Sequence, residues 1–300
     1  MVVGDVVAFE SGMVKEKDLP EGYRSVSRSG LNIVFKEGYA ETFGEFSLPE
    51  GSSGDDGAPA LRGRGTLASL ALAEGAGERA LLRKCIRGGV FGRFLGGLYL
   101  NAGTPRPLSE LKISQYARAS GITTPEVLAA VFQGVGPFFY RGALAVREIS
   151  PSADLEVELA SLGHPAKGEA LGRKRRTISS LGRLVAKMHE AGIWHADLHL
   201  KNILLAQEDG GPKLYLLDLD AARVVNPLSG FRRRLNILRL YRSVEKANRR
   251  GRVITRTDLL RFLRSYAEHS SRPLRESAVR LGRMLPLWRL KWKLSDALGV

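Results

Sequence analysis

Polar residues that could perform chemistry gather in one short segment, GIWHADLHLKNILL, which is apolar at both ends. It holds a carboxylate, Asp197, and five positions later an amide, Asn202; a second acidic cluster, Asp218-Leu219-Asp220, lies further along the chain. Phosphoryl transfer needs a carboxylate to accept or orient the proton of an attacking hydroxyl, and oxygen ligands for Mg²⁺ on nucleotide phosphates. The spacing therefore predicts Asp197 as the base, with Asn202 and Asp218 as metal ligands.

Regular elements must bring these residues together. Apolar residues recur at three- and four-residue spacings over Thr177–Ala191, which predicts a helix that Thr177 caps and Gly192 ends. After the polar segment we expect a strand over Ile203–Leu205, a turn at EDGGP and a strand, LYLL, that ends at Asp218. This hairpin would bring Asp218-Leu219-Asp220 back beside Asp197 and Asn202.

Upstream, apolar stretches punctuated by glycine predict a compact antiparallel sheet. GRGT, residues 63–66, is typical of a turn between strands. The expected strands are Leu67–Leu72, Arg79–Ile86, the stretch Glu126–Phe132, Phe138–Tyr140 and Leu144–Ile149, and the expected helix is Leu108–Ala119.

The composition, 300 residues with 44% apolar content, suits one large domain or two lobes with a real core. Cys85 is the single cysteine, which excludes an internal disulfide and fits a reducing compartment. The start of the chain lacks the basic residues of a signal peptide, and no stretch reaches the roughly 18 apolar residues of a membrane span. We therefore expect a soluble, cytoplasmic protein.

Basic charge is concentrated near the end of the chain. The net charge is +15, and residues 231–300 hold 19 basic and 5 acidic residues, nearly the whole surplus. This excess predicts a contact with something anionic, with solvated helix faces as the alternative. LGRMLPLWRLKWKLSDAL interleaves tryptophan with basic residues, which suits either lipid headgroups or a core-facing terminal helix. Because no nucleic-acid motif occurs, no nucleic-acid partner is expected.

HADLHLKN followed by LLDLD resembles the catalytic loop and metal-binding segment of the protein-kinase-like fold, in a form typical of small-molecule and sugar kinases. With GRGT, LLRKCIRGG and LYLLDLDAAR, these segments resemble the lipopolysaccharide kinase family, whose members phosphorylate Kdo or heptose in the inner core. The resemblance implies an α+β, two-lobed protein-kinase-like fold: a small antiparallel β-sheet N-lobe over residues 59–150 and a mainly helical C-lobe over residues 151–300. Residues 1–50 would be an N-terminal extension of unclear role.

The resemblance also implies an ATP site. The turn over the phosphates would consist of Gly63, Arg64, Gly65 and Thr66, because glycine lets backbone N–H groups approach phosphate oxygens. Either Arg83 or Lys84 would contact the phosphates and pair with Glu110; they point to opposite faces of one strand, so only one can. The backbone around Glu148 would hold the adenine.

The resemblance assigns further roles around the base, Asp197. His195 is expected to hold the loop by hydrogen bonds. His199 would either donate a hydrogen bond to the transferred phosphate or pack against the loop. Asp220, which stands where most kinases have the glycine of Asp-Phe-Gly, is either a second metal contact or a capping residue, and an activation-loop switch is not expected.

The leading prediction is a kinase, dependent on ATP and Mg²⁺, that phosphorylates a sugar hydroxyl of the lipopolysaccharide inner core at the cytoplasmic face of the inner membrane. No required protein partner is predicted. One alternative is a kinase of this fold acting on another small molecule or on protein. Another is a non-catalytic pseudokinase, against which the joint presence of Asp197, Asn202 and Asp218 argues.

Overall fold

The computed structural model describes residues 16–46, 66–73, 77–85, 98–101, 103–163, 166–209, 211–251 and 254–271, with Pro286, Trp288, Arg289 and Trp292. Contacts divide the chain into two compact units, Met1–Tyr116 with Pro125–Ile149, and Ala117–Thr124 with Ser150–Val300. The expected lobe boundary at residue 150 lies beside this division. Gly63, Arg64 and Gly65 lie outside the described residues, and only the backbone of Thr66 is described.

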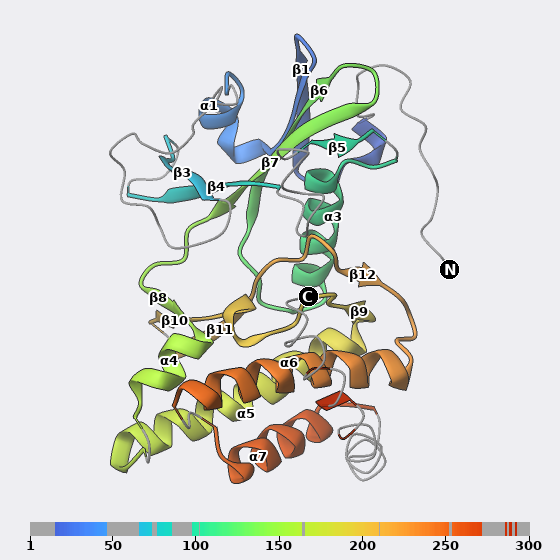
Figure 1. Ribbon diagram of the computed structural model, residues 1–300. Coiled ribbons are helices and arrows are strands. Elements are labelled where there is room, and N and C mark those ends of the chain that lie inside the picture. The colour runs from blue at the N-terminus through green and yellow to red at the C-terminus, as the bar shows by residue number, and fades with distance from the viewer. Residues whose placement is uncertain are drawn as a thin grey trace. The chain divides into compact units, whose positions relative to one another are not determined.

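The first unit is built on a seven-stranded antiparallel sheet (Figure 1). Its elements are η1 (Glu16–Asp18), β1 (Tyr23–Arg28), β2 (Leu31–Lys36), η2 (Glu37–Tyr39), α1 (Ala40–Phe43), β3 (Thr66–Ala71), β4 (Arg79–Lys84), β5 (Tyr99–Leu100), α3 (Arg106–Ala119), β6 (Val127–Val135) and β7 (Phe139–Arg147). The strand order is β1-β2-β6-β7-β4-β3, and β5 pairs with β7. Because β2 pairs with β6, part of the N-terminal segment extends the sheet by two strands.

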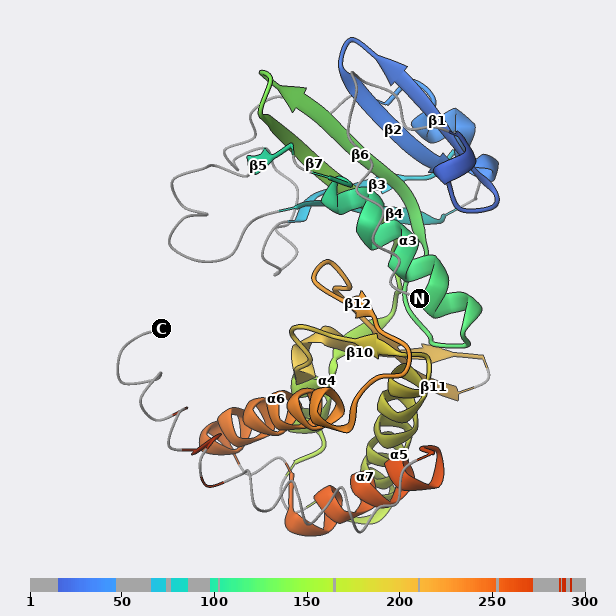
Figure 2. The same ribbon diagram turned by 90° about the vertical axis from the view of Figure 1, so that its right-hand side faces the viewer.

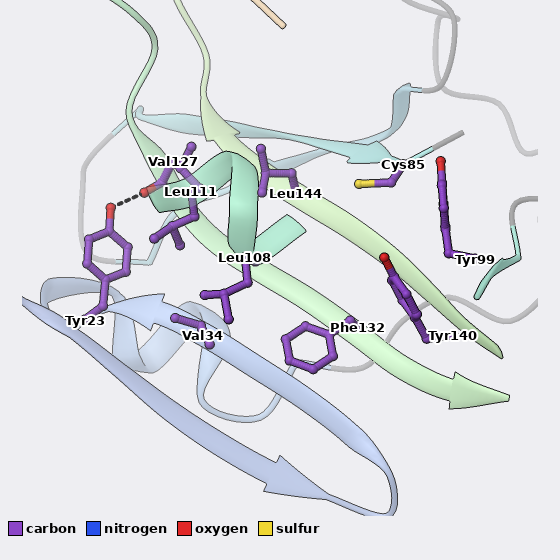
Figure 3. Packing of buried hydrophobic residues seen from close by; sticks show 11 residues of the cluster. Tyr23, Val34, Cys85, Tyr99, Leu108, Leu111, Val127, Phe132, Tyr140 and Leu144 are labelled. Carbon is purple, nitrogen blue, oxygen red and sulfur yellow. Dashed lines mark hydrogen bonds between the residues drawn. The ribbon is translucent and has the colours of Figure 1, made fainter. Parts of the chain in front are cut away.

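Both faces of this sheet are buried. On one face, Leu108 and Leu111 of α3 pack in a cluster with Val34, Phe132 and Leu144 (Figure 3). On the other face, a second cluster contains Phe43 of α1 and the strand residues Ile33, Leu128, Val131 and Ala145. Since successive strand residues point to opposite faces, a strand covered on both sides reads as a continuous apolar run rather than an alternating one.

β7 is one strand, where we expected two short ones on either side of Gly142. That expectation was wrong because Gly142 does not end the strand. A Cβ added there would lie 2.6 Å from Cγ of Pro107, so glycine allows the first turn of α3 to approach the sheet closely.

The second unit is mainly helical. Its elements are β8 (Ser152–Asp154), α4 (Leu155–Ser161), α5 (Gly168–Glu190), β9 (Ile193–Trp194), η3 (Leu200–Asn202), β10 (Ile203–Glu208), β11 (Gly211–Leu216), β12 (Arg223–Val224), α6 (Gly230–Arg250) and α7 (Arg256–Glu268). Strands β11, β10 and β8 form one small sheet, and β12 pairs with β9. Figure 2 shows α5 packed along α7, where Gly182 allows close contact: a Cβ there would lie 2.5 Å from the carbonyl oxygen of Phe262.

The predicted start of the catalytic-loop helix at Thr177 was also wrong. α5 begins at Gly168, and Thr177 lies buried within it rather than capping it. The earlier turns lack an apolar stripe because their buried contact is polar: Lys174 forms a 2.9 Å ion pair with Asp258 of α7, and both side chains are almost fully buried. A search for apolar periodicity therefore misses this half of the helix.

Described residues of the basic C-terminal segment lie against α6. Arg289 ion-pairs with Glu245 and donates a hydrogen bond to the hydroxyl of Tyr241. Trp292 is only 6% exposed, and the guanidinium of Arg242 lies 5.9 Å from its ring centroid. Within the described residues, none of the helices combines the length and the hydropathy needed to span a bilayer.

Candidate active site

The loop after α5 is anchored by His195, which is 1% exposed. Its Nε2 donates to the carbonyl of Leu217 at 2.9 Å, and its Nδ1 accepts from the N–H of Asp197 at 3.1 Å. These two bonds specify the neutral tautomer with the proton on Nε2. Burial also lowers the pKa of His195, so the ring acts here as a neutral tie between two loops.

Asp197 presents its carboxylate to solvent, with 71% of the side chain exposed. His199 Nε2 lies 3.3 Å from its Oδ2. The hydrogen bond from His199 lowers the pKa of Asp197, and the positive charge of Arg239 acts in the same direction. An accessible carboxylate that stays ionised is what a proton acceptor requires.

Asn202 ties the loop to the start of the acidic cluster. Its Nδ2 donates to the carbonyl of Asp197 at 2.8 Å, which leaves the amide oxygen as the group able to bind a ligand. Its own carbonyl accepts from the N–H of Leu217, also at 2.8 Å, directly before Asp218. The structure thus brings Asp197, Asn202 and Asp218 together in one hydrogen-bonded unit.

Asp218 has a left-handed backbone conformation, with φ 58°. Among non-glycine residues aspartate tolerates this region better than most, yet it remains uncommon. The following residue, Leu219, is 2% exposed, whereas Asp218 itself is exposed. At this turn the side chain of Leu219 is buried and anchors the chain, whereas the carboxylate of Asp218 stays accessible. Asp220 is only partly exposed.

Asn236 of α6 is a site residue that our sequence analysis missed. It is 0% exposed; Nδ2 donates to the carbonyl of His195, and Oδ1 lies 3.3 Å from the backbone N of His195 and 3.2 Å from Nε2 of His189. His189 Nδ1 lies 2.9 Å from the hydroxyl of Tyr266 in α7. A signal was present: Asn236 falls at helical spacing with the buried Leu240 and Val244, a polar residue on an apolar stripe.

In the first unit, Arg83 of β4 ion-pairs with Glu110 of α3. Glu110 is 4% exposed. Of the two candidates on β4, it is therefore Arg83 whose side chain meets the helix glutamate. The Glu148 carboxylate lies 3.5 Å from the guanidinium of Arg79, and the Glu148 backbone N–H donates to the carbonyl of Arg79, so this side chain is engaged at the start of β4.

The donor set suits a magnesium ion that arrives with a nucleotide. Within the described residues, no group of three His, Cys, Asp or Glu side chains could hold a metal by itself. Mg²⁺ is usually bound by one or two protein oxygens and completes its shell with phosphates and water. An amide oxygen at Asn202 and a carboxylate at Asp218 match that requirement.

Comparison with known proteins agrees with this geometry. Residues 59–266 match the lipopolysaccharide kinase (Kdo/WaaP) family. A 3-deoxy-D-manno-octulosonic acid kinase of Haemophilus influenzae (strain PittEE) is 31% identical over 188 residues, 62% of this chain and 73% of that protein. One from Xanthomonas euvesicatoria pv. vesicatoria is 32% identical over 192 residues, 62% and 70% of the two chains. The solved structure "WaaP in complex with acyl carrier protein" matches with TM-score 0.50 and 25% identity, over 74% of this chain and 86% of that one.

Fold and site together define a phosphotransferase of the α+β, two-lobed protein-kinase-like class. The chain belongs to the lipopolysaccharide kinase (Kdo/WaaP) family. The resemblance seen in the sequence is therefore confirmed at the level of family and fold.

Proposed function

We propose that the protein transfers the γ-phosphate of ATP, with Mg²⁺, to a hydroxyl of Kdo in the lipopolysaccharide inner core, with heptose as the alternative acceptor. The observation that carries this proposal is the hydrogen-bonded unit of Asp197, Asn202 and the Leu217–Asp218 turn. Kdo is preferred because the curated relatives cited above are Kdo kinases.

In this mechanism Asp197 accepts the proton of the acceptor hydroxyl. The hydrogen bond from His199 keeps its carboxylate ionised and oriented. Asn202 Oδ1 and the carboxylate of Asp218 would hold Mg²⁺, which when bound supplies positive charge to the β- and γ-phosphates. Asp220 would be a further metal contact, while Arg83, together with the turn Gly63–Thr66, would bind the phosphates.

The test is transfer of label from γ-labelled ATP with Mg²⁺ to one of four acceptors: Kdo-lipid A precursor, heptosylated core, a free aminoglycoside and a protein mixture. Label in the Kdo glycolipid supports the proposal, and label in the heptosylated core alone selects the alternative sugar. Label only in protein or aminoglycoside contradicts it. Asp197→Asn should reduce transfer by ~10²-fold or more, since a positioned base contributes that much. Asp209→Asn, which removes an exposed carboxylate from the β10–β11 hairpin, is the matched control and should keep wild-type rates.

We further propose that the protein works at the cytoplasmic face of the inner membrane, where the arginines of residues 231–300 meet anionic headgroups. Trp292 is buried, so this contact would depend on charge rather than on that tryptophan. Sedimentation with vesicles containing 30% anionic lipid should fall steeply as salt is raised. Acyl carrier protein, present in the solved relative, is a candidate partner to be tested by co-elution in size-exclusion chromatography.

A further inference from the structure

Trp194 and Arg239 form a pair beside the catalytic loop. Trp194 ends β9 and directly precedes His195. Arg239 comes from α6, and its guanidinium carbon lies 5.4 Å from the centroid of the Trp194 ring. A cation over an indole face is attracted to it, and the aromatic surface holds the planar guanidinium in place. The arginine is therefore kept in position next to the loop that carries Asp197.

Two hydrogen-bond donors in this pair have no acceptor among the described residues. They are Nη1 of Arg239 and the indole Nε1 of Trp194, and both atoms are hidden from solvent. Buried donors of folded proteins are nearly always satisfied, and an unsatisfied one is costly. These two donors are closed to solvent as the side chains stand, so a ligand with acceptor oxygens would satisfy them only after the Arg239 side chain moves. Arg239 as a residue is only partly buried, so part of it meets solvent.

A second cation lies on the same side of Trp194. Arg223 of β12 is directly opposite Trp194 in the antiparallel β9–β12 pair, and directly opposed side chains leave the same face. Arg223 is exposed. Arg239 therefore packs on the indole ring, and Arg223 leaves the same face of the strand pair. Guanidinium forks match carboxylate and phosphate oxygens.

Arg239 is not paired with the proton acceptor. No ion pair joins Arg239 to Asp197 among the described side chains. Arg239 instead packs on the ring of Trp194, which lies close to Asp197 in the sequence. A small molecule could meet Arg239 with one group while it turns another group toward Asp197.

We propose that Arg239, assisted by Arg223, binds an anionic substituent of the acceptor, a carboxylate or a phosphate, and so selects acidic sugars and directs their hydroxyl to Asp197. This inference rests on the proposed sugar kinase function. It assigns the choice of acceptor to Arg239 and Arg223, which are not among the residues proposed to transfer the phosphate. An aminoglycoside, whose amines are protonated at neutral pH, lacks the anionic group that this site recognises.

The test compares KM for the acceptor among four variants: Arg239→Gln, Arg239→Lys, Arg223→Gln, and the control Arg183→Gln, an exposed arginine of α5. Arg239→Gln should raise the acceptor KM about tenfold or more, because a charge-assisted hydrogen bond contributes that much, with KM for ATP unchanged. Arg239→Lys should recover part of the loss, and Arg183→Gln should show none. An acceptor KM equal in Arg239→Gln and Arg183→Gln would overturn the proposal.

Modified acceptors identify the group. Wild-type enzyme is offered Kdo-lipid A precursor with methyl-esterified carboxyl groups, and separately the same glycolipid with its phosphates removed. The modification that deletes the recognised anion should raise the wild-type KM and abolish any further effect of Arg239→Gln. If neither modification changes the wild-type KM, the proposal fails even when Arg239→Gln is impaired. Because this experiment uses wild-type enzyme, its outcome does not depend on whether a variant folds.

A binding arm separates this inference from the proposed function. Free Kdo and inorganic phosphate are titrated while tryptophan fluorescence is recorded, with Trp194→Phe to assign the signal. A response that is present in wild type and lost in both Trp194→Phe and Arg239→Gln supports the anion site even if no glycolipid is phosphorylated. Glycolipid phosphorylation without this response, and without any KM effect, would retain the function and reject the site.

Discussion

The amide of Asn236 clamps the backbone of His195 from both sides, with Nδ2 on its carbonyl and Oδ1 accepting from its N–H. Because His195 in turn bonds to the Asp197 N–H and the Leu217 carbonyl, this α6 side chain determines where the catalytic loop lies. The geometry of Asp197 thus depends on Asn236, which lies 41 positions after His195 in the chain.

Asn236→Ala should lower both stability and turnover. It leaves buried polar groups of His195 without partners, which costs about 1–3 kcal/mol, and the loosened loop should lower kcat about tenfold or more with little change in KM for ATP. Asn248→Ala is a matched control: Asn248 clamps the backbone N–H and carbonyl of Ile254 in the same way, away from the catalytic loop. Urea unfolding and steady-state kinetics measure both. Equal loss of kcat in the two variants would contradict a positioning role.

His189 should make the protein sensitive to mild acid. Burial and the neighbouring Arg233 charge lower the pKa of His189 to about 3. Since this folded value lies below the ordinary value of about 6.5, the stabilisation is complete above that pH and is lost as the pH falls toward 3. Between pH 7.5 and 5.0 the free energy of unfolding should fall by about 2 kcal/mol from this group alone.

The pH range in which stability is lost distinguishes His189 from the neighbouring Glu190. The pKa of Glu190 is lowered to about 2 by its bonds to Arg233 and Ser271, against the effect of burial, so it contributes only below its ordinary value near 4.5. In urea titrations, His189→Gln should therefore make the free energy of unfolding depend less on pH above pH 5. Some dependence should remain, because burial also lowers the pKa of His195. His269→Gln, at an exposed site, should behave as wild type. An unchanged slope in His189→Gln would reject this assignment.

Asp218→Asn should weaken the use of magnesium. The substitution keeps the size of the side chain and removes its charge, so we expect the Mg²⁺ concentration for half-maximal transfer to rise about tenfold or more. Without nucleotide, the melting temperature should stay near that of wild type, because Asp218 is exposed. Asp209→Asn serves as control. A magnesium dependence that Asp218→Asn does not change would exclude this carboxylate as a ligand.

Arg83 and Glu110 should behave as a coupled pair. Arg83→Gln removes a cation from the 4% exposed Glu110, which should cost about 3 kcal/mol of stability and raise KM for ATP. Lys84→Gln should cost less than about 1 kcal/mol. The double variant Arg83→Gln/Glu110→Gln should be more stable than the sum of the single losses predicts. Additive losses in denaturant unfolding would show that the two side chains are not coupled.

The resemblance of short sequence segments was enough to identify the family and the fold, and the spacing of polar residues predicted that Asp197, Asn202 and Asp218 would gather. These residues lie within or beside short segments whose spacing alone limits how they can be arranged. The roles that we give to them remain predictions. The turn Gly63–Thr66 remains one as well, because it lies mostly outside the described residues.

Long-range packing decided the remainder. Strand alternation shows that Arg83 and Lys84 face opposite ways, but only the position of α3 determines which of them meets Glu110. Pairing of β2 with β6 and the contact of Trp194 with Arg239 join segments far apart in the chain. α5 was half missed because its first turns bury the ion pair of Lys174 with Asp258, and a local pattern of apolar residues contains no sign of a partner on another helix.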